Sequence, residues 1–156
     1  MKLRINRVIN VDRILKTPDG SLKLMICSTP ISIDVTFHGI RDRGPARFPG
    51  AITPDSTVRD IVSKAIAPFQ YKTLVCQNVP LKDVTKEFPN SEAVFQVPFN
   101  PTLENLALYT FSQCYQMVQH DESLKVSVTK VEVFDIQRGV TSVYELGDPD
   151  VGLTLD

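Results

Sequence analysis

Apolar and polar residues alternate along the first forty positions in a way that predicts two strands. Residues 3 to 16 are rich in β-branched side chains and partly alternate, which indicates a strand. The sequence Thr-Pro-Asp-Gly at 17–20 is typical of a turn, because proline presets φ and glycine tolerates a positive φ. Residues 21 to 38 then resume as a strand that is interrupted near Pro30, which lacks a ladder donor. Its second part alternates strictly, with apolar residues at Ile31, Ile33, Val35 and Phe37.

The residues after position 53 change to a helical period. Apolar side chains recur at i, i+3, i+4, i+7 and i+8, at Val58, Ile61, Val62, Ala65 and Ile66. Thr53 can cap this helix with Pro54 at its first position, or Asp55 can cap it instead. Pro68 ends it.

A second helix is predicted from Thr102, a good N-cap, to about Val118. Glu104 lies in its first turn, where the helix dipole favours an acid. Apolar residues cover more than one of its faces, so we expect it to be buried by more than its own sheet, for example by contacts between subunits. Residues 69 to 100, with three prolines, are predicted to be an irregular and functional segment.

The last part of the chain predicts a closing hairpin. Leu124, Val126 and Val128 share one parity, whereas Val131 and Val133 share the other, so we expect a bulge near residues 129–130. Residues 137–139 make the turn, and residues 140–146 return as the last strand. The remaining residues, 147–156, are predicted to be an acidic tail.

The predicted order is therefore ββααββ, an α+β fold in one domain over residues 1–146. Two hairpins can join into one four-stranded antiparallel sheet with both helices on one face. Such a sheet has open edges, so we expect neighbouring subunits to close it into a barrel.

Composition and charge limit the classes of partner and the compartment that we expect for the chain. The 156 residues carry 17 basic and 18 acidic side chains, a net charge of −1, which argues against non-specific nucleic-acid binding. The three cysteines are odd in number and widely spaced, which predicts a reducing cytoplasm and neither a disulfide framework nor a zinc ribbon. We find no apolar run typical of a signal peptide or a membrane span, so we expect no membrane partner.

Three stretches resemble the 6-pyruvoyltetrahydropterin and 6-carboxytetrahydropterin synthases, which have the tunnelling fold. They are VTFHG at 35–39, PTLENLALYTF at 101–111 and KVEVFDIQRGVTSVY at 130–144. With the element order, the resemblance covers roughly residues 31 to 146. It implies a homo-oligomer of three to six subunits and a pterin-like or purine-like ligand.

The chain also departs from this family. The family holds zinc with three histidines, whereas this chain has two in total, His38 and His120, so we expect no metal and no other cofactor. The family's stretch Asp-His-Lys-Asn-Leu, which supplies its catalytic histidine and aspartate, corresponds to QYKTL at 70–74. Tyr71 stands in place of the histidine and no aspartate is present, so the family's proton relay is missing. Cys27 lies in the region of the family's catalytic cysteine, but without a metal or an adjacent base we interpret it as a small buried hydrophobe rather than a nucleophile.

The resemblance also implies binding residues. The family anchors the pterin with a glutamate, because a carboxylate accepts both the exocyclic amine and the ring N–H; Asp135 takes that position, although an aspartate also commonly opens a turn. Thr102 and Glu104 match residues near the pocket, or they only cap the helix and complement its dipole.

Two further groups of residues have a functional interpretation beside an ordinary one. Arg43 and Arg47, in an arginine-rich loop, suit a phosphate, or they belong to a solvated loop. Tyr71 and Lys72 resemble the acid–base pair of some tunnelling-fold aldolases, or they are a packing tyrosine beside a surface lysine.

Three functions follow from these residues. The first is a metal-free relative of the pterin synthases that binds a pterin-like or purine-like ring. The second is a zinc-independent pterin-converting enzyme, of the lyase or aldolase type, acting through Cys27, Tyr71 or Lys72. The third is a non-catalytic, ring-forming structural protein whose pocket is filled by its own side chains.

Overall fold

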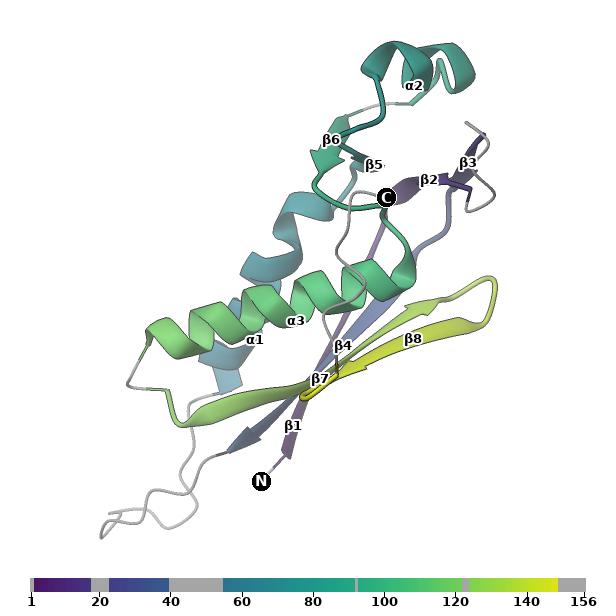
Figure 1. Cartoon of the computed structure of the whole chain (residues 1–156). Coiled ribbons are helices and arrows are strands. Elements are labelled where there is room, and N and C mark those ends of the chain that lie inside the picture. The colour runs from purple at the N-terminus through teal and green to yellow at the C-terminus, as the bar shows by residue number, and fades with distance from the viewer. Residues whose placement is uncertain (1, 18–22, 40–54, 92, 122–123, 149–156) are drawn as a thin grey trace, which may run out of the picture.

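The computed structural model describes residues 2–17, 23–39, 55–91, 93–121 and 124–148 (Figure 1). The strands are β1 Lys2–Ile9, β2 Asp12–Lys16, β3 Leu24–Cys27, β4 Ile31–Gly39, β5 Thr73–Cys76, β6 Val94–Val97, β7 Val126–Asp135 and β8 Val140–Glu145. The helices are α1 Asp55–Ile66, α2 Leu81–Glu87 and α3 Leu103–His120, and a short 3-10 turn, η1, spans Ala67–Phe69. Among these helices, none is long and apolar enough to cross a membrane.

The predicted four-stranded antiparallel sheet is present, in the order β1-β4-β7-β8. Helix α3 packs on β7 and β8, and α1 packs on β1 and on α3 (Figure 1). The strict alternation in β4 places its apolar side chains in the core, where Ile31, Ile33, Val35 and Phe37 are completely buried. Burial of one face of this sheet under two helices supplies the main hydrophobic core.

A β-bulge lies in β7, as predicted. Thr36 pairs with Lys130 and the next residue, Phe37, pairs with Val128, so Thr129 is the extra residue. The bulge restores the parity of the strand, because the valines before and after it all face the core: Val126, Val128, Val131 and Val133.

A second sheet corrects the predicted ββααββ order. It contains β3-β2-β5-β6, in which β2 pairs with β3 antiparallel while β2–β5 and β5–β6 are parallel. It lies at the end of the molecule where α3 begins (Figure 1). The predicted irregular segment 69–100 thus holds two strands and helix α2. All four residues of β5 are buried, so its short run has no alternation to reveal it.

The predicted first strand is also divided. Residues 3 to 16 form β1 and β2, which leave Asn10 and Val11 between them and belong to different sheets. The second predicted strand divides likewise, into β3 and β4 on either side of Pro30. The outer part of the first predicted hairpin, β1 and β4, therefore joins β7 and β8 in the first sheet, whereas its inner part, β2 and β3, belongs to the second sheet.

Helix α3 is capped as predicted, since the Thr102 hydroxyl accepts a hydrogen bond from the Asn105 N–H at 3.2 Å. Its buried residues cover more than one face because the helix packs on the sheet and on α1. The predicted cap at Thr53 and Pro54 lies outside the described residues, as do residues 149–156 of the predicted tail.

Candidate functional site

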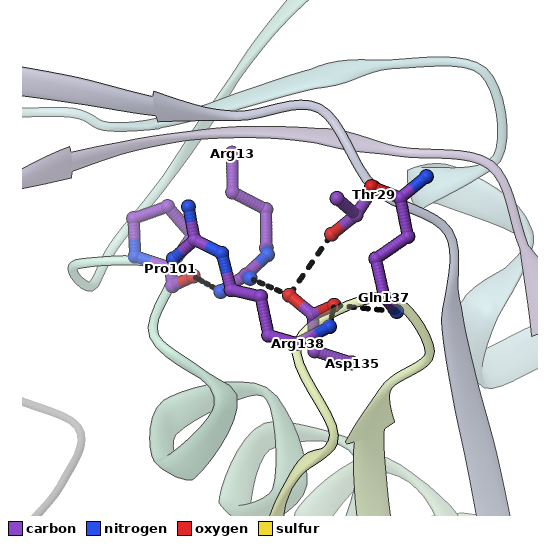
Figure 2. A network of polar contacts seen from close by, with 6 residues as sticks. All are labelled: Arg13, Thr29, Pro101, Asp135, Gln137 and Arg138. Atoms are coloured by element: carbon purple, nitrogen blue, oxygen red, sulfur yellow. Dashed lines mark hydrogen bonds and ion pairs between the residues drawn. The ribbon is translucent and has the colours of Figure 1, made fainter.

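The last residue of β7, Asp135, is the centre of a buried polar network (Figure 2). Its side chain is 1% exposed, and its Oδ1 accepts hydrogen bonds from the backbone N–H groups of Gln137 at 3.1 Å and Arg138 at 3.0 Å. The turn closes with Gly139, whose φ of 67° is left-handed and whose N–H donates to the Asp135 carbonyl. The interpretation of Asp135 as a turn-opening residue is therefore confirmed.

The other carboxylate oxygen of Asp135 joins the two sheets. Its Oδ2 accepts from the Thr29 hydroxyl at 2.9 Å and from Arg13 Nη2 at 3.5 Å (Figure 2). Arg13 comes from β2, is 3% exposed, and donates Nη1 to the Pro101 carbonyl, next to the start of α3, at 3.1 Å. The buried ion pair of Arg13 and Asp135 thus joins the second sheet to the first. The bond from Arg13 to Pro101 connects this pair to the N-terminus of α3.

Burial, hydrogen bonds and the opposite charge of the partner together shift the pKa values of Asp135 and Arg13. Burial opposes ionisation of Asp135, but the N–H donors of Arg138 and Gln137, the Thr29 hydroxyl and the Arg13 charge outweigh it and hold the pKa of this carboxyl below its ordinary value. Burial lowers the pKa of the Arg13 guanidinium, which stays protonated. A carboxylate has about four acceptor positions. Asp135 therefore has all of them engaged by the chain itself.

Four of the residues singled out in the sequence gather around Arg13. Asp135 is paired with it, Thr102 follows Pro101, and Cys27 is its partner in the β2–β3 ladder. Burial is the main influence on the Arg13 pKa and lowers it, and Glu104, exposed in the first turn of α3, is the weakest of the groups that raise it.

All three cysteines are buried. Cys27 is 1% exposed, and Cys76 and Cys114 are also buried and free. Burial raises the pKa of the Cys114 thiol to about 12. Arg43 and Arg47, the predicted phosphate contacts, lie outside the described residues.

Tyr71 and Lys72 lie apart from this network, at a pocket of about 400 Å³. Four connections meet there, those between β1 and β2, between β3 and β4, between η1 and β5, and between α2 and β6. The lining residues are Asn10, Val11, Asp12, Ser28, Thr29, Pro30, Tyr71, Lys72, Thr73 and Asn90. Thr29 also belongs to the Asp135 network, so the pocket adjoins the buried ion pair.

The backbone of Tyr71 is strained at the edge of this pocket. Its φ is 59°, in the left-handed region, although it is not a glycine, and its side chain is 72% exposed. The Tyr71 N–H donates to the Asn10 carbonyl at 2.7 Å, and the Lys72 carbonyl accepts from the Asp12 N–H at 3.0 Å. Surrounding hydrogen bonds hold a conformation that is unfavourable for tyrosine. Such outliers cluster at functional sites.

Asp12 is a pocket residue that sequence reasoning missed. It is the first residue of β2 and is half-buried, and within the described residues its carboxylate has neither a hydrogen bond nor an ion pair. An acid at the start of a strand carries no signal in the sequence. Only the meeting of these connections shows that Asp12 lines the same pocket as Tyr71 and Lys72.

No three histidine, cysteine or acidic side chains lie close enough together to hold a metal ion in the described part of the chain. His38 is near the end of β4, and His120 is the last residue of α3. Neither histidine lines the pocket.

The strain at Tyr71 gives a first prediction. Tyr71→Gly should raise the free energy of unfolding by roughly 0.5–1 kcal/mol, because relief of about 1–2 kcal/mol of left-handed strain exceeds the added backbone entropy of glycine. Ala93 is exposed and also left-handed, with a φ of 47°, so Ala93→Gly is a matched control that should shift stability in the same direction. Urea unfolding measures both. Loss of stability in Tyr71→Gly alone would show that the ring is held for packing.

Comparison with known proteins gives the fold. No model of a known protein family matches the chain, and no curated protein sequence does. Among solved structures, the 6-pyruvoyl tetrahydropterin synthase of Plasmodium vivax matches with a TM-score of 0.57 and 13% identity over 94% of this chain and 98% of that chain. The Plasmodium falciparum protein of the same name matches with a TM-score of 0.57 and 14% identity over the same shares. The chain therefore has the fold of 6-pyruvoyl tetrahydropterin synthase, as the three sequence stretches predicted.

Proposed function

We propose that this protein binds a small flat heterocycle of the pterin or purine type in the pocket lined by Asp12, Tyr71 and Lys72. The observation that carries the proposal is the Asp12 carboxylate, which has no internal partner among the described residues and lies at a pocket of about 400 Å³. That volume is in the range of small-molecule sites. The fold shared with the pterin synthases supports the same ligand class.

The three side chains suit different parts of such a ligand. The exposed Tyr71 ring offers a face for stacking, which contributes roughly 1–3 kcal/mol per base in nucleic-acid complexes. Asp12 accepts hydrogen bonds from ring and exocyclic N–H groups, and Lys72 donates to a ring carbonyl. Asp135, the family-like anchor, suits this role less, because its acceptor positions already hold four donors. Thr102 and Glu104 stay predicted contacts, as do Arg43 and Arg47 for a phosphate-bearing ligand.

Calorimetric titration with pterin and guanosine tests the proposal. We expect binding to wild-type protein, and a loss of at least about tenfold in affinity for Asp12→Ala, because a hydrogen bond to a charged group contributes about 1.5–3 kcal/mol. Tyr71→Gly should weaken binding while the protein stays folded. Asp34→Ala is the control, since Asp34 is an acid of β4 that does not line the pocket. Binding unchanged in both pocket variants would refute the site.

A catalytic function is the second candidate, because the strained Tyr71 and Lys72 line the same pocket. A phenol and an amine can move a proton or form a Schiff base without a metal. Turnover of dihydropterin substrates by wild-type protein, lost in Lys72→Met, is the discriminating assay. Cys27 is buried and does not line the pocket, so this candidate rests on Tyr71 and Lys72.

The open edges of the first sheet favour assembly into a ring, which is the third candidate. Strands β1 and β8 are the two edges of an antiparallel sheet, and they expose Val8, Val140 and Val143. Pairing of β8 with β1 of another copy would continue the antiparallel order and cover these edges. We propose a homo-oligomer of three to six subunits in the cytoplasm, where the three buried thiols stay reduced. Light scattering coupled to gel filtration measures its mass.

A further inference from the structure

We infer that the pocket takes its ring as part of a ribonucleoside, and that Asn10, Ser28 and Asn90 bind the vicinal hydroxyl groups of the sugar. This inference rests on the proposed function and narrows its ligand to one substrate class. The side chains that we assign to the ring leave these three lining residues without a role. We call them the hydroxyl-binding residues.

The hydroxyl-binding residues come from three separate connections and are all exposed. Asn10 lies between β1 and β2, Ser28 between β3 and β4, and Asn90 between α2 and β6. The hydrogen bonds of Asn10 with Gln70 and Tyr71 use only its backbone N–H and carbonyl. Within the described part of the chain, none of the three side chains has a hydrogen bond or an ion pair. Three polar side chains that the protein itself does not engage therefore line one pocket.

The lining of this pocket is more polar than that of a typical ligand site. Small-molecule sites are lined mostly by apolar side chains with a few polar groups. Here every lining residue except Val11 and Pro30 carries a polar group in its side chain. A flat ring alone would cover some of these groups without bonding to them, and burial of an unbonded polar group costs free energy. A ligand that fills the pocket must therefore bring polar groups besides those of the ring.

Hydroxyl groups match the hydroxyl-binding residues better than a phosphate does. Amides and hydroxyls both donate and accept hydrogen bonds, as the hydroxyl groups of a sugar do. A phosphate favours several cations. Among the described residues that line the pocket, Lys72 alone is cationic, and the Asp12 carboxylate repels an anion. For a purine, the hydroxylated substituent is a ribose, and a volume of about 400 Å³ is in the range that holds a ligand of nucleoside size.

Calorimetric titration compares guanosine with 2′,3′-dideoxyguanosine, which has the same ring and lacks both hydroxyl groups. Wild-type protein should bind guanosine about 5- to 100-fold more tightly, which corresponds to two neutral hydrogen bonds. Ser28→Ala and Asn90→Ala should each lower the affinity for guanosine by about 2- to 10-fold and leave the affinity for dideoxyguanosine unchanged. Ser127→Ala is the control, since Ser127 is a serine of β7 that does not line the pocket, and it should keep the wild-type ratio.

The outcomes separate the inference from the proposed function. Equal affinity of the wild-type protein for the two nucleosides overturns the binding of the sugar, while binding of the ring stands. A preference for guanosine that persists unchanged in Ser28→Ala and Asn90→Ala overturns the assignment of these residues, as do equal losses for both nucleosides. Binding of neither nucleoside overturns the inference, and the titration with pterin then decides the proposed function. The wild-type comparison needs no substitution, so it holds even if a variant does not fold.

Discussion

Asp135→Ala is expected to lower the free energy of unfolding by about 3–5 kcal/mol, the cost of breaking a buried ion pair by removing one partner. The substitution leaves the Arg13 guanidinium, 3% exposed, without its counter-charge. It also removes the acceptor for the Thr29 hydroxyl and for two backbone N–H groups of the β7–β8 turn. Arg13 Nε already has no partner within the described structure, so the remaining charge has little compensation. Urea unfolding followed by circular dichroism measures the loss.

Asp34→Ala is the matched control, because it breaks a shorter ion pair in an exposed place. Arg4 and Asp34 are 3.2 Å apart, with side chains 55% and 25% exposed, whereas Arg13 and Asp135 are 3.5 Å apart and buried. Exposed pairs contribute about 0–1 kcal/mol. Equal losses from the two substitutions would show that burial does not decide the value of the Arg13–Asp135 pair.

A double-mutant cycle separates the ion pair from the turn. Asp135→Asn keeps an oxygen acceptor for the turn N–H groups of Gln137 and Arg138 but removes the charge. Arg13→Met removes the guanidinium and keeps an apolar stem. The double variant should lose less stability than the sum of the two single losses, because neither partner is then left as an unpaired buried charge.

The first sheet could be predicted because each of its features leaves a local pattern. The alternation in β4, the change of parity at Thr129 and the cap at Thr102 depend on neighbouring residues. The second sheet leaves no such pattern. Strand β5 is four residues long and buried throughout, and its pairing with β2 joins positions about sixty residues apart. Parallel pairing of that kind is determined by the tertiary fold.

The residues of the candidate site also differ in whether a local sequence pattern predicts them. A turn-opening role for Asp135 could be predicted from residues beside it, but its pairing with Arg13 joins residues 122 positions apart. The resemblance to a family drew attention to Tyr71 and Lys72, and both line the pocket. Asp12 was missed because its place at the pocket depends on the position of the η1–β5 connection next to it. The pocket therefore combines residues that motifs can find with one that only the fold identifies.

Acid should destabilise the protein through Asp135. Its pKa in the folded state is below the unfolded value of about 3.9, so the ionised network contributes stability above the unfolded pKa and loses it as the pH falls through the folded pKa. In Asp135→Asn this loss is absent, so the stability gap between wild type and variant should narrow as the pH is lowered from neutral into that range. Thr102→Ala is the control: loss of an N-cap costs about 1 kcal/mol and involves no titrating group, so its gap should stay constant. Urea unfolding across the acid range measures both gaps. A gap for Asp135→Asn that stays constant or widens in acid would show that the carboxyl is not held ionised by its four donors.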